Sequence, residues 1–158
     1  MIRIPMTPEG RVQLEAELKH LKEVVRMQVV RDIEEARAHG DISENAEYDA
    51  AKDKQGFIEG RILELEAKLA AAQIIDPATL DADGRVVFGA TVELEEEASG
   101  AAVTYQIVGD DEADLKLGLI SVSSPIARAL IGKSEGDMAE VRAPGGLKTY
   151  EIVGVRYV

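Results

Sequence analysis

Asp41 and Glu44 are the two residues whose type and spacing point most directly to chemistry. Both carry carboxylates, and they stand three positions apart in the segment Gly40-Asp41-Ile42-Ser43-Glu44. Mg²⁺ prefers oxygen ligands and is often held by one or two carboxylates, while water and a phosphate complete its shell. Two carboxylates do not form a closed site by themselves. The functional interpretation is therefore a ligand pair that completes an open metal site in a partner.

The spacing of Asp41 and Glu44 also fits the start of a helix. An acidic N-cap residue followed three positions later by Glu is close to a capping box, which is worth about 1 kcal/mol. Carboxylates in a first helical turn also interact favourably with the helix dipole. Spacing alone favours this structural interpretation, and the two interpretations do not exclude each other.

Apolar residues recur at steps of three and four on both sides of the acidic pair, which predicts two helices. When the two rows are paired outward from residues 41–42, the residue numbers add up to 83 in the outer four pairs and to 84 in the inner three. A nearly constant sum is what an antiparallel hairpin requires, so the acidic pair is predicted at its tip. The pairs are Leu14 with Leu69, Leu18 with Leu65, Leu21 with Ile62, Val25 with Ile58, Val29 with Gln55, Ile33 with Ala51, and Ala36 with Tyr48.

The first helix is predicted from Pro8, behind a Thr7 N-cap, to about residue 39, and the second helix from about residue 43 to 73. At about 1.5 Å per residue, roughly 30 residues give an arm on the order of 45 Å long. Gly56 and Gly60 lie inside the second helix, and each costs about 1 kcal/mol relative to Ala. The favoured explanation is close approach of the two helices near Phe57. The alternative is contact with something outside the chain.

The C-terminal half predicts a second domain. After a linker rich in Asp, Pro and Gly at residues 76–84, the apolar period shortens to two. One helix interrupts the strands, with Ser124 as its N-cap and Pro125 at its first position. The pattern predicts an α+β fold in which an antiparallel sheet carries one helix on one face. The domains are thus an arm at 1–75, the linker, and a domain at 85–158. Strands are expected at 85–88, 91–96, 103–108, 117–122, 138–143 and 149–158.

Two charged clusters have both a structural and a functional interpretation. Four basic residues, of which Arg37 and Lys52 lie within about two turns of the acidic pair, fit a solvated helix face, but they also fit a path that guides a phosphate backbone. The acidic loop at residues 109–114 fits a solvated turn, and as a calcium loop it is a poor match because its glycine precedes the acids. A protein-docking edge is its functional alternative. The basic residues are Arg37, Lys52, Lys54 and Arg61.

Composition excludes several classes of function. The chain has no cysteine and two histidines, which argues against thiol chemistry and a histidine-rich zinc site. A formal net charge of −12 opposes independent binding to nucleic-acid phosphates. No long apolar run predicts a signal peptide or a membrane span, so a cytoplasmic protein without a membrane partner is expected.

Segment 40–48, Gly-Asp-Ile-Ser-Glu-Asn-Ala-Glu-Tyr, resembles the tip motif of the GreA/GreB transcript cleavage factors of bacterial RNA polymerase. The resemblance covers essentially the whole chain. Further matching segments are 55–57, 59–62, 107–114 and 124–133.

This resemblance implies a coiled-coil arm followed by a C-terminal domain of FKBP-like fold. The partner would be RNA polymerase, with the arm in its secondary channel and the C-terminal domain on the channel rim. The expected activity is stimulation of the polymerase's own cleavage of the 3′ end of backtracked nascent RNA. The chain itself would hydrolyse nothing and would bind no cofactor alone.

The resemblance also assigns residues by position. Asp41 and Glu44 would help to hold a Mg²⁺ ion shared with the polymerase active site, and Arg37 and Lys52 would face the RNA 3′ segment. The acidic loop and the start of the C-terminal helix would dock on polymerase. Two rival functions stay open, a prolyl isomerase or chaperone suggested by the fold and a plain coiled-coil adaptor. The docking residues are Asp110, Asp111, Glu112, Asp114, Ser124 and Pro125.

Overall fold

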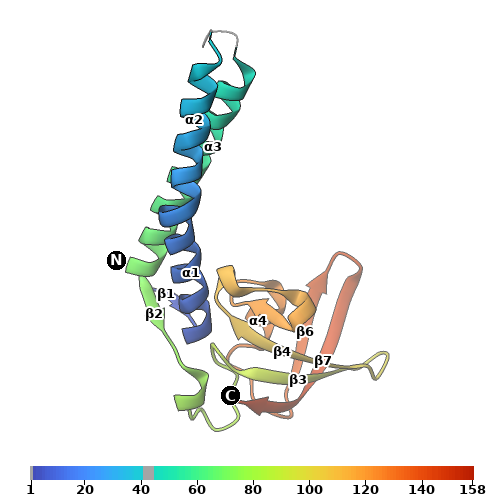
Figure 1. Cartoon of the computed structure of the whole chain (residues 1–158). Coiled ribbons are helices and arrows are strands. Elements are labelled where there is room, and N and C mark those ends of the chain that lie inside the picture. Colours follow the sequence, from blue (N-terminus) through green and yellow to red (C-terminus); the bar gives the residue numbers. More distant parts are fainter. Residues whose placement is uncertain (1, 41–44) are drawn as a thin grey trace. The chain divides into compact units, whose positions relative to one another are not determined.

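The computed structural model describes residues 2–40 and 45–158, and these residues divide into two compact units (Figure 1). One unit comprises Ile2 and Arg11–Ala72, and the other comprises Arg3–Gly10 and Gln73–Val158. The sequence predicts residues 1–75 as one arm, whereas Arg3–Gly10 cluster with the C-terminal unit. The mixed α+β composition and the N-terminal helical hairpin are as predicted.

The hairpin consists of one long helical segment and its antiparallel partner. The first segment runs through α1 (Pro8–His20), a π-helical stretch (Leu21–Val25) and α2 (Arg26–Ala38). The second is α3 (Ala46–Ala70), which lies along α2 (Figure 1). Because α3 begins at Ala46 and ends at Ala70, it is shorter at both ends than the sequence predicts.

The π-helical stretch explains a detail of the apolar pattern. The summed residue numbers of the paired positions change from 83 to 84 between Val25 and Val29, at the C-terminal end of this stretch. A π turn holds more residues than an α turn because its hydrogen bonds span five positions. The extra length shifts the register of the first segment, and the apolar stripe stays directed toward α3.

Buried aliphatic side chains hold the hairpin together, and ion pairs cross it. Val29 and Ile33 of α2 pack with Ala51, Ile58 and Ile62 of α3. Burial of each valine or isoleucine side chain stabilises by about 1.5–3 kcal/mol, and the smaller Ala51 contributes less. Two guanidinium groups bridge the helices, from Arg26 to Glu59 at 2.7 Å and from Arg61 to Glu17 at 2.9 Å. Because these ion pairs are partly exposed, they add orientation more than stability.

The C-terminal unit contains a five-stranded sheet in the order β5-β4-β3-β7-β6. Strands β3, β4, β6 and β7 pair antiparallel, but β4 and β5 are parallel, so the purely antiparallel sheet expected from the sequence is wrong at this edge. The expected strand at 85–88 is reduced to an isolated bridge between Arg85 and Ser134. The strand bounds are β3 Thr91–Glu96, β4 Ala102–Val108, β5 Leu119–Ser121, β6 Met138–Ala143 and β7 Gly146–Arg156.

One α-helix, α4 (Pro125–Leu130), covers a face of this sheet. Ser124 is its N-cap and accepts a hydrogen bond from the Ala127 N–H group at 3.3 Å. Ala127 and Leu130 are fully buried in the core that the strands form. Two short strands outside this sheet, β1 (Ile4–Met6) and β2 (Ala72–Ile74), pair with each other. Among the helices of the described residues, none has an apolar stretch of the length needed to span a bilayer.

Candidate functional site

Asp41 and Glu44 lie outside the described residues, but the helix ends on either side are described. Gly40 has a φ of +113°, a backbone conformation that favours glycine and suits its predicted position at the end of a helix. Asn45 is the N-cap of α3, and its Oδ1 accepts a hydrogen bond from the Tyr48 N–H group at 3.0 Å. The N-cap role that the sequence suggests for Asp41 therefore belongs to Asn45 in this helix.

Asn45 also joins the two helices. Its Nδ2 donates to the Ala36 carbonyl near the end of α2 at 2.6 Å. That carbonyl also accepts the backbone N–H group of His39, the C-cap residue of α2, at 3.2 Å. The N-cap role of Asn45 could have been predicted from the sequence, since Asn is a favoured N-cap residue. The hydrogen bond to Ala36 could not have been predicted from the sequence, because it depends on how the two helices meet.

Two further contacts connect the same helix ends. The Arg37 guanidinium lies 5.8 Å from the centroid of the Tyr48 ring, within the range of a cation–π contact. His39 Nδ1 lies 3.0 Å from a carboxylate oxygen of Glu47, and both side chains are exposed. Arg37 stays exposed as well. The helix ends on either side of residues 41–44 are thus tied by Asn45, by the Arg37–Tyr48 contact and by the His39–Glu47 contact.

The other predicted basic residues differ in how fully their charges are engaged. Lys52 is exposed, and its Nζ donates to Gln55 Oε1 at 3.0 Å, so its charge is not neutralised by that contact. Arg61 forms ion pairs with Glu17 and with Glu64. Arg61 is thus paired with carboxylates, whereas the contacts of Arg37 and Lys52 are to an aromatic ring and to a neutral amide.

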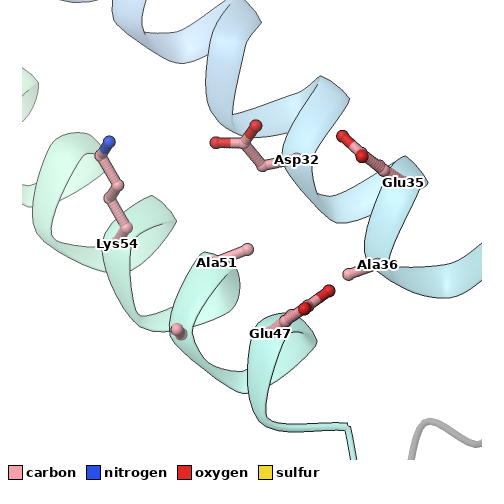
Figure 2. Close-up of a pocket in the computed structure, with 7 residues that line it drawn as sticks. Asp32, Glu35, Ala36, Glu47, Ala51 and Lys54 are labelled. Carbon is pink, nitrogen blue, oxygen red and sulfur yellow. The ribbon is translucent and has the colours of Figure 1, made fainter. Parts of the chain in front are cut away.

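An open groove lies between α2 and α3 near these helix ends. Figure 2 shows acidic side chains from both helices around it, with Ala36 and Ala51 between them. Its volume is about 340 Å³. Within residues 2–40 and 45–158, no group of three His, Cys, Asp or Glu side chains is arranged to hold a metal ion. The labelled acids are Asp32, Glu35 and Glu47, and Lys54 lies at the same groove.

Ion pairing lowers the pKa of two carboxyl groups on α3. The hydrogen bond from the Arg26 guanidinium is the main cause that holds the pKa of the Glu59 carboxyl below its ordinary value of 4.5. The Lys68 ammonium does the same for the pKa of Glu64. Glu59 and Glu64 are thus charged and paired at neutral pH.

The predicted docking acids belong to the connection between the parallel strands β4 and β5. A parallel pair needs a crossover, and residues 109–118 provide it. Asp110 Oδ1 accepts hydrogen bonds from the hydroxyls of Ser121 and Ser123. Asp114 accepts from the Lys116 N–H group at 3.1 Å, and Asp111 is exposed. Two of these acids therefore help to shape the crossover.

Glu112 makes its hydrogen bonds inside the molecule. Its carboxylate accepts from the Thr7 N–H group at 3.0 Å, from the Thr7 hydroxyl, and from the Gly109 N–H group at 2.9 Å. A Cβ added to Gly10 would collide with this carboxylate, and one added to Gly109 would lie 2.8 Å from the Pro5 carbonyl. Sequence reasoning missed this contact because Thr7 and Glu112 stand 105 positions apart.

Some of the predicted docking residues come together at the start of α4. The Ser124 hydroxyl donates to the Ser121 carbonyl at 2.7 Å, and the Ser121 hydroxyl donates to Asp110. Pro125 follows as the first residue of the helix. Asp110, Ser124 and Pro125 thus share one hydrogen-bonded corner of the C-terminal unit, whereas Glu112 is directed to Thr7.

Two family models match this chain, one in each half. "Transcription elongation factor, N-terminal" matches residues 4–74, and "Transcription elongation factor, GreA/GreB, C-term" matches residues 81–157. These matches identify the class of protein as a transcription elongation factor. Together with the relatives below, they show that the chain belongs to the GreA/GreB family.

Curated relatives match over the full length. The chain is 65% identical to transcription elongation factor GreA of Verminephrobacter eiseniae over 99% of each chain. It is 66% identical to the GreA of Ralstonia nicotianae over 100% of each. Among solved structures, GreA factor homolog 1 of Thermus thermophilus is 28% identical with a TM-score of 0.43, and the match covers 98% of this chain and 99% of that one.

Proposed function

We propose that this protein binds bacterial RNA polymerase, inserts its helical hairpin in the secondary channel, and stimulates the polymerase's intrinsic cleavage of the 3′ end of backtracked nascent RNA. This activity would rescue arrested complexes. Membership of the GreA/GreB family over both halves of the chain is the observation that carries the proposal. Such a protein acts where transcription takes place, in the cytoplasm.

In the proposed mechanism, Asp41 and Glu44 supply carboxylate oxygens toward the polymerase active site, and such oxygens suit Mg²⁺. A Mg²⁺ ion shared with polymerase would activate the attacking water or stabilise the leaving oxygen, as in two-metal hydrolysis. Arg37 lies on α2 and Lys52 on α3, and their exposure supports a role against the RNA phosphates. The chain would act as an accessory factor, while polymerase carries out the hydrolysis.

We further propose that the C-terminal unit has an FKBP-like fold and docks at the rim of the channel. The corner formed by Asp110, Ser124 and Pro125 is suited to this contact, with the exposed Asp111 and Asp114 beside it in the chain. Glu112 would act indirectly, since its carboxylate holds Thr7. The rival isomerase activity is less well supported because the aromatic residues of this unit pack against its core. They are Phe88, Tyr105, Tyr150 and Tyr157.

The test uses polymerase stalled in a backtracked complex with 3′-labelled RNA and Mg²⁺. The wild-type protein is compared with an Asp41→Asn/Glu44→Gln double variant. Wild type is expected to release short 3′ fragments, and the variant is expected to bind without stimulating cleavage. Circular dichroism checks that the variant stays helical, and competition against labelled wild type checks its binding.

Each other result has a definite meaning. Equal cleavage by both proteins would show that the carboxylates act only in the structure of the tip. Binding without cleavage by either would identify a regulator that occupies the channel. If the wild type does not bind polymerase, the proposed function is wrong.

A further inference from the structure

The two edges of the five-stranded sheet differ in how their backbone groups are used. At the β5 edge, Leu119 exchanges backbone hydrogen bonds with Asp114 at 2.9 and 3.0 Å. At the β6 edge, the backbone of residues 138–143 bonds to β7, and no other described residue bonds to it. An edge strand with free N–H and C=O groups is a template for pairing with another strand.

The hydrogen bonds of β7 decide which backbone groups of β6 are free. In an antiparallel pair, the N–H and C=O groups of one residue point to the same neighbour, and this direction alternates along the strand. Thr149 lies opposite Glu140, but its carbonyl accepts from the Glu97 N–H group on the other side of β7 at 2.9 Å. The backbone groups of Glu140 therefore point away from β7. By the same alternation, those of Met138 and Arg142 also point away from β7.

The side chains at these edge positions carry opposite charges. Glu140 and Arg142 are exposed, whereas Ala139 and Val141 between and beside them are buried in the core of the unit. Among the described residues, neither Glu140 nor Arg142 has an ion-pair or hydrogen-bond partner for its side chain. These two residues thus combine free backbone groups with unpaired charges on one face of the strand.

We propose that β6 pairs antiparallel with β6 of a second copy of this chain, with Glu140 of each copy opposite Arg142 of the other. A two-fold contact repeats every pair, so this register joins two Glu–Arg pairs and the backbone groups beside them. The neighbouring registers that keep the same faces together place Glu140 opposite Glu140 or Arg142 opposite Arg142, and like charges directly opposite each other are destabilising. The pairing ends where Pro144, which has no N–H group, faces Met138.

The order of the two charges argues for a second copy as the partner. Charged residues on an edge strand usually prevent pairing. That protection requires like charges to meet, whereas Glu140 and Arg142 match each other by symmetry in one register. A strand of another protein would need the complementary order of charges by coincidence. Because the contact is small and two chains of net charge −12 repel each other, we expect a weak, transient dimer.

A charge-exchange series tests the pairing by sedimentation equilibrium of the full chain over a range of concentrations. Arg142→Glu is expected to weaken association by about tenfold or more, because both symmetric pairs change from attraction to repulsion. Glu140→Arg should weaken it similarly, since Arg then faces Arg. An equimolar mixture of these two variants should associate again, because every Arg then faces a Glu. Circular dichroism checks that both variants are folded.

Glu95→Arg is the matched control for the change in net charge. Glu95 is exposed on β3, an interior strand of the sheet, so this variant should not weaken association. Amide hydrogen exchange then locates the contact. The N–H groups of Glu140 and Arg142 should become protected as the concentration rises, while those of Ala139 and Val141, which face β7, should not change.

The proposal does not rest on the proposed function, and neither measurement uses polymerase. A chain that stays monomeric at every concentration would overturn it. A dimer that both charge variants leave unchanged would place the contact on another surface and would overturn it as well. Failure of the equimolar mixture to associate, with wild-type dimers present, would show that Glu140 does not face Arg142.

Discussion

Asn45 shows how one side chain organises the end of the hairpin. Its amide oxygen caps α3 through the Tyr48 N–H group, and its amide nitrogen binds the Ala36 carbonyl of α2. A carboxylate in the same place would retain only the first of these bonds, because it has no donor. The contributions of the amide oxygen and of the amide nitrogen to stability can therefore be separated by mutation.

We expect Asn45→Ala to destabilise the hairpin by about 1 kcal/mol, the usual cost of losing an N-cap. Asn45→Asp retains the acceptor, so its loss should be smaller and should report mainly on the bond to Ala36. Urea unfolding followed by far-UV circular dichroism measures both changes. If Asn45→Asp were as stable as wild type, the Ala36 bond would contribute nothing.

At the scale of elements, the hairpin combines a buried aliphatic seam with ion pairs along its edges. The seam fixes which faces of the helices meet, while Arg26–Glu59 and Arg61–Glu17 connect particular turns. The π-helical stretch between α1 and α2 corrects the register so that the seam continues. The aliphatic side chains do not titrate, so the stability of the hairpin should depend on pH through its ion pairs.

Acidification should weaken the Arg26–Glu59 bridge. Because the folded-state pKa of Glu59 is lowered from 4.5, its stabilisation is present above that value and is lost as the pH falls through the lower folded pKa. The melting temperature of wild type should therefore decline below about pH 4.5 more steeply than that of Glu59→Gln. Glu15→Gln is the matched control, since the Glu15–Arg11 pair lies within α1. Parallel declines in wild type and Glu59→Gln would contradict the bridge.

At the scale of the whole molecule, the N-terminal residues 3–10 belong to the C-terminal unit. Thr7 is only 1% exposed, and its N–H and hydroxyl groups both donate to Glu112. One buried residue at the beginning of the chain thus depends on a carboxylate from the β4–β5 crossover. Leaving such buried donors without an acceptor is more costly than the bond itself is worth.

We expect Glu112→Ala to destabilise the C-terminal unit by about 1–3 kcal/mol, because the N–H groups of Thr7 and Gly109 lose their acceptor. Amide hydrogen exchange is the suitable measurement, since two units need not unfold together. Asp114→Ala is the control and should change exchange much less, because Asp114 caps an exposed turn. Unchanged exchange at Thr7 in Glu112→Ala would contradict this role.

Much of the molecule was predictable from local patterns. The antiparallel hairpin followed from apolar residues at steps of three and four, because the helical period alone decides which side chains share a face. Ser124, Pro125 and the strands β3, β4 and β6 followed from capping chemistry and alternation. The acidic pair was likewise visible from residue type, and both its place at the tip and its chemistry stay predictions because Asp41 and Glu44 lie outside the described residues.

The tertiary structure decided what depends on residues far apart in the chain. Alternation predicts a strand but not its neighbour, so the parallel pairing of β5 with β4 was missed. The acidic residues of the crossover fit a solvated turn by residue type, whereas the structure shows that Glu112 accepts a hydrogen bond from Thr7. Glycine in a helix predicts either a close neighbour or an open face, and only the positions of surrounding atoms assigned Gly56 and Gly60 to the open face. In each case the sequence specifies the local conformation, whereas packing selects the partner.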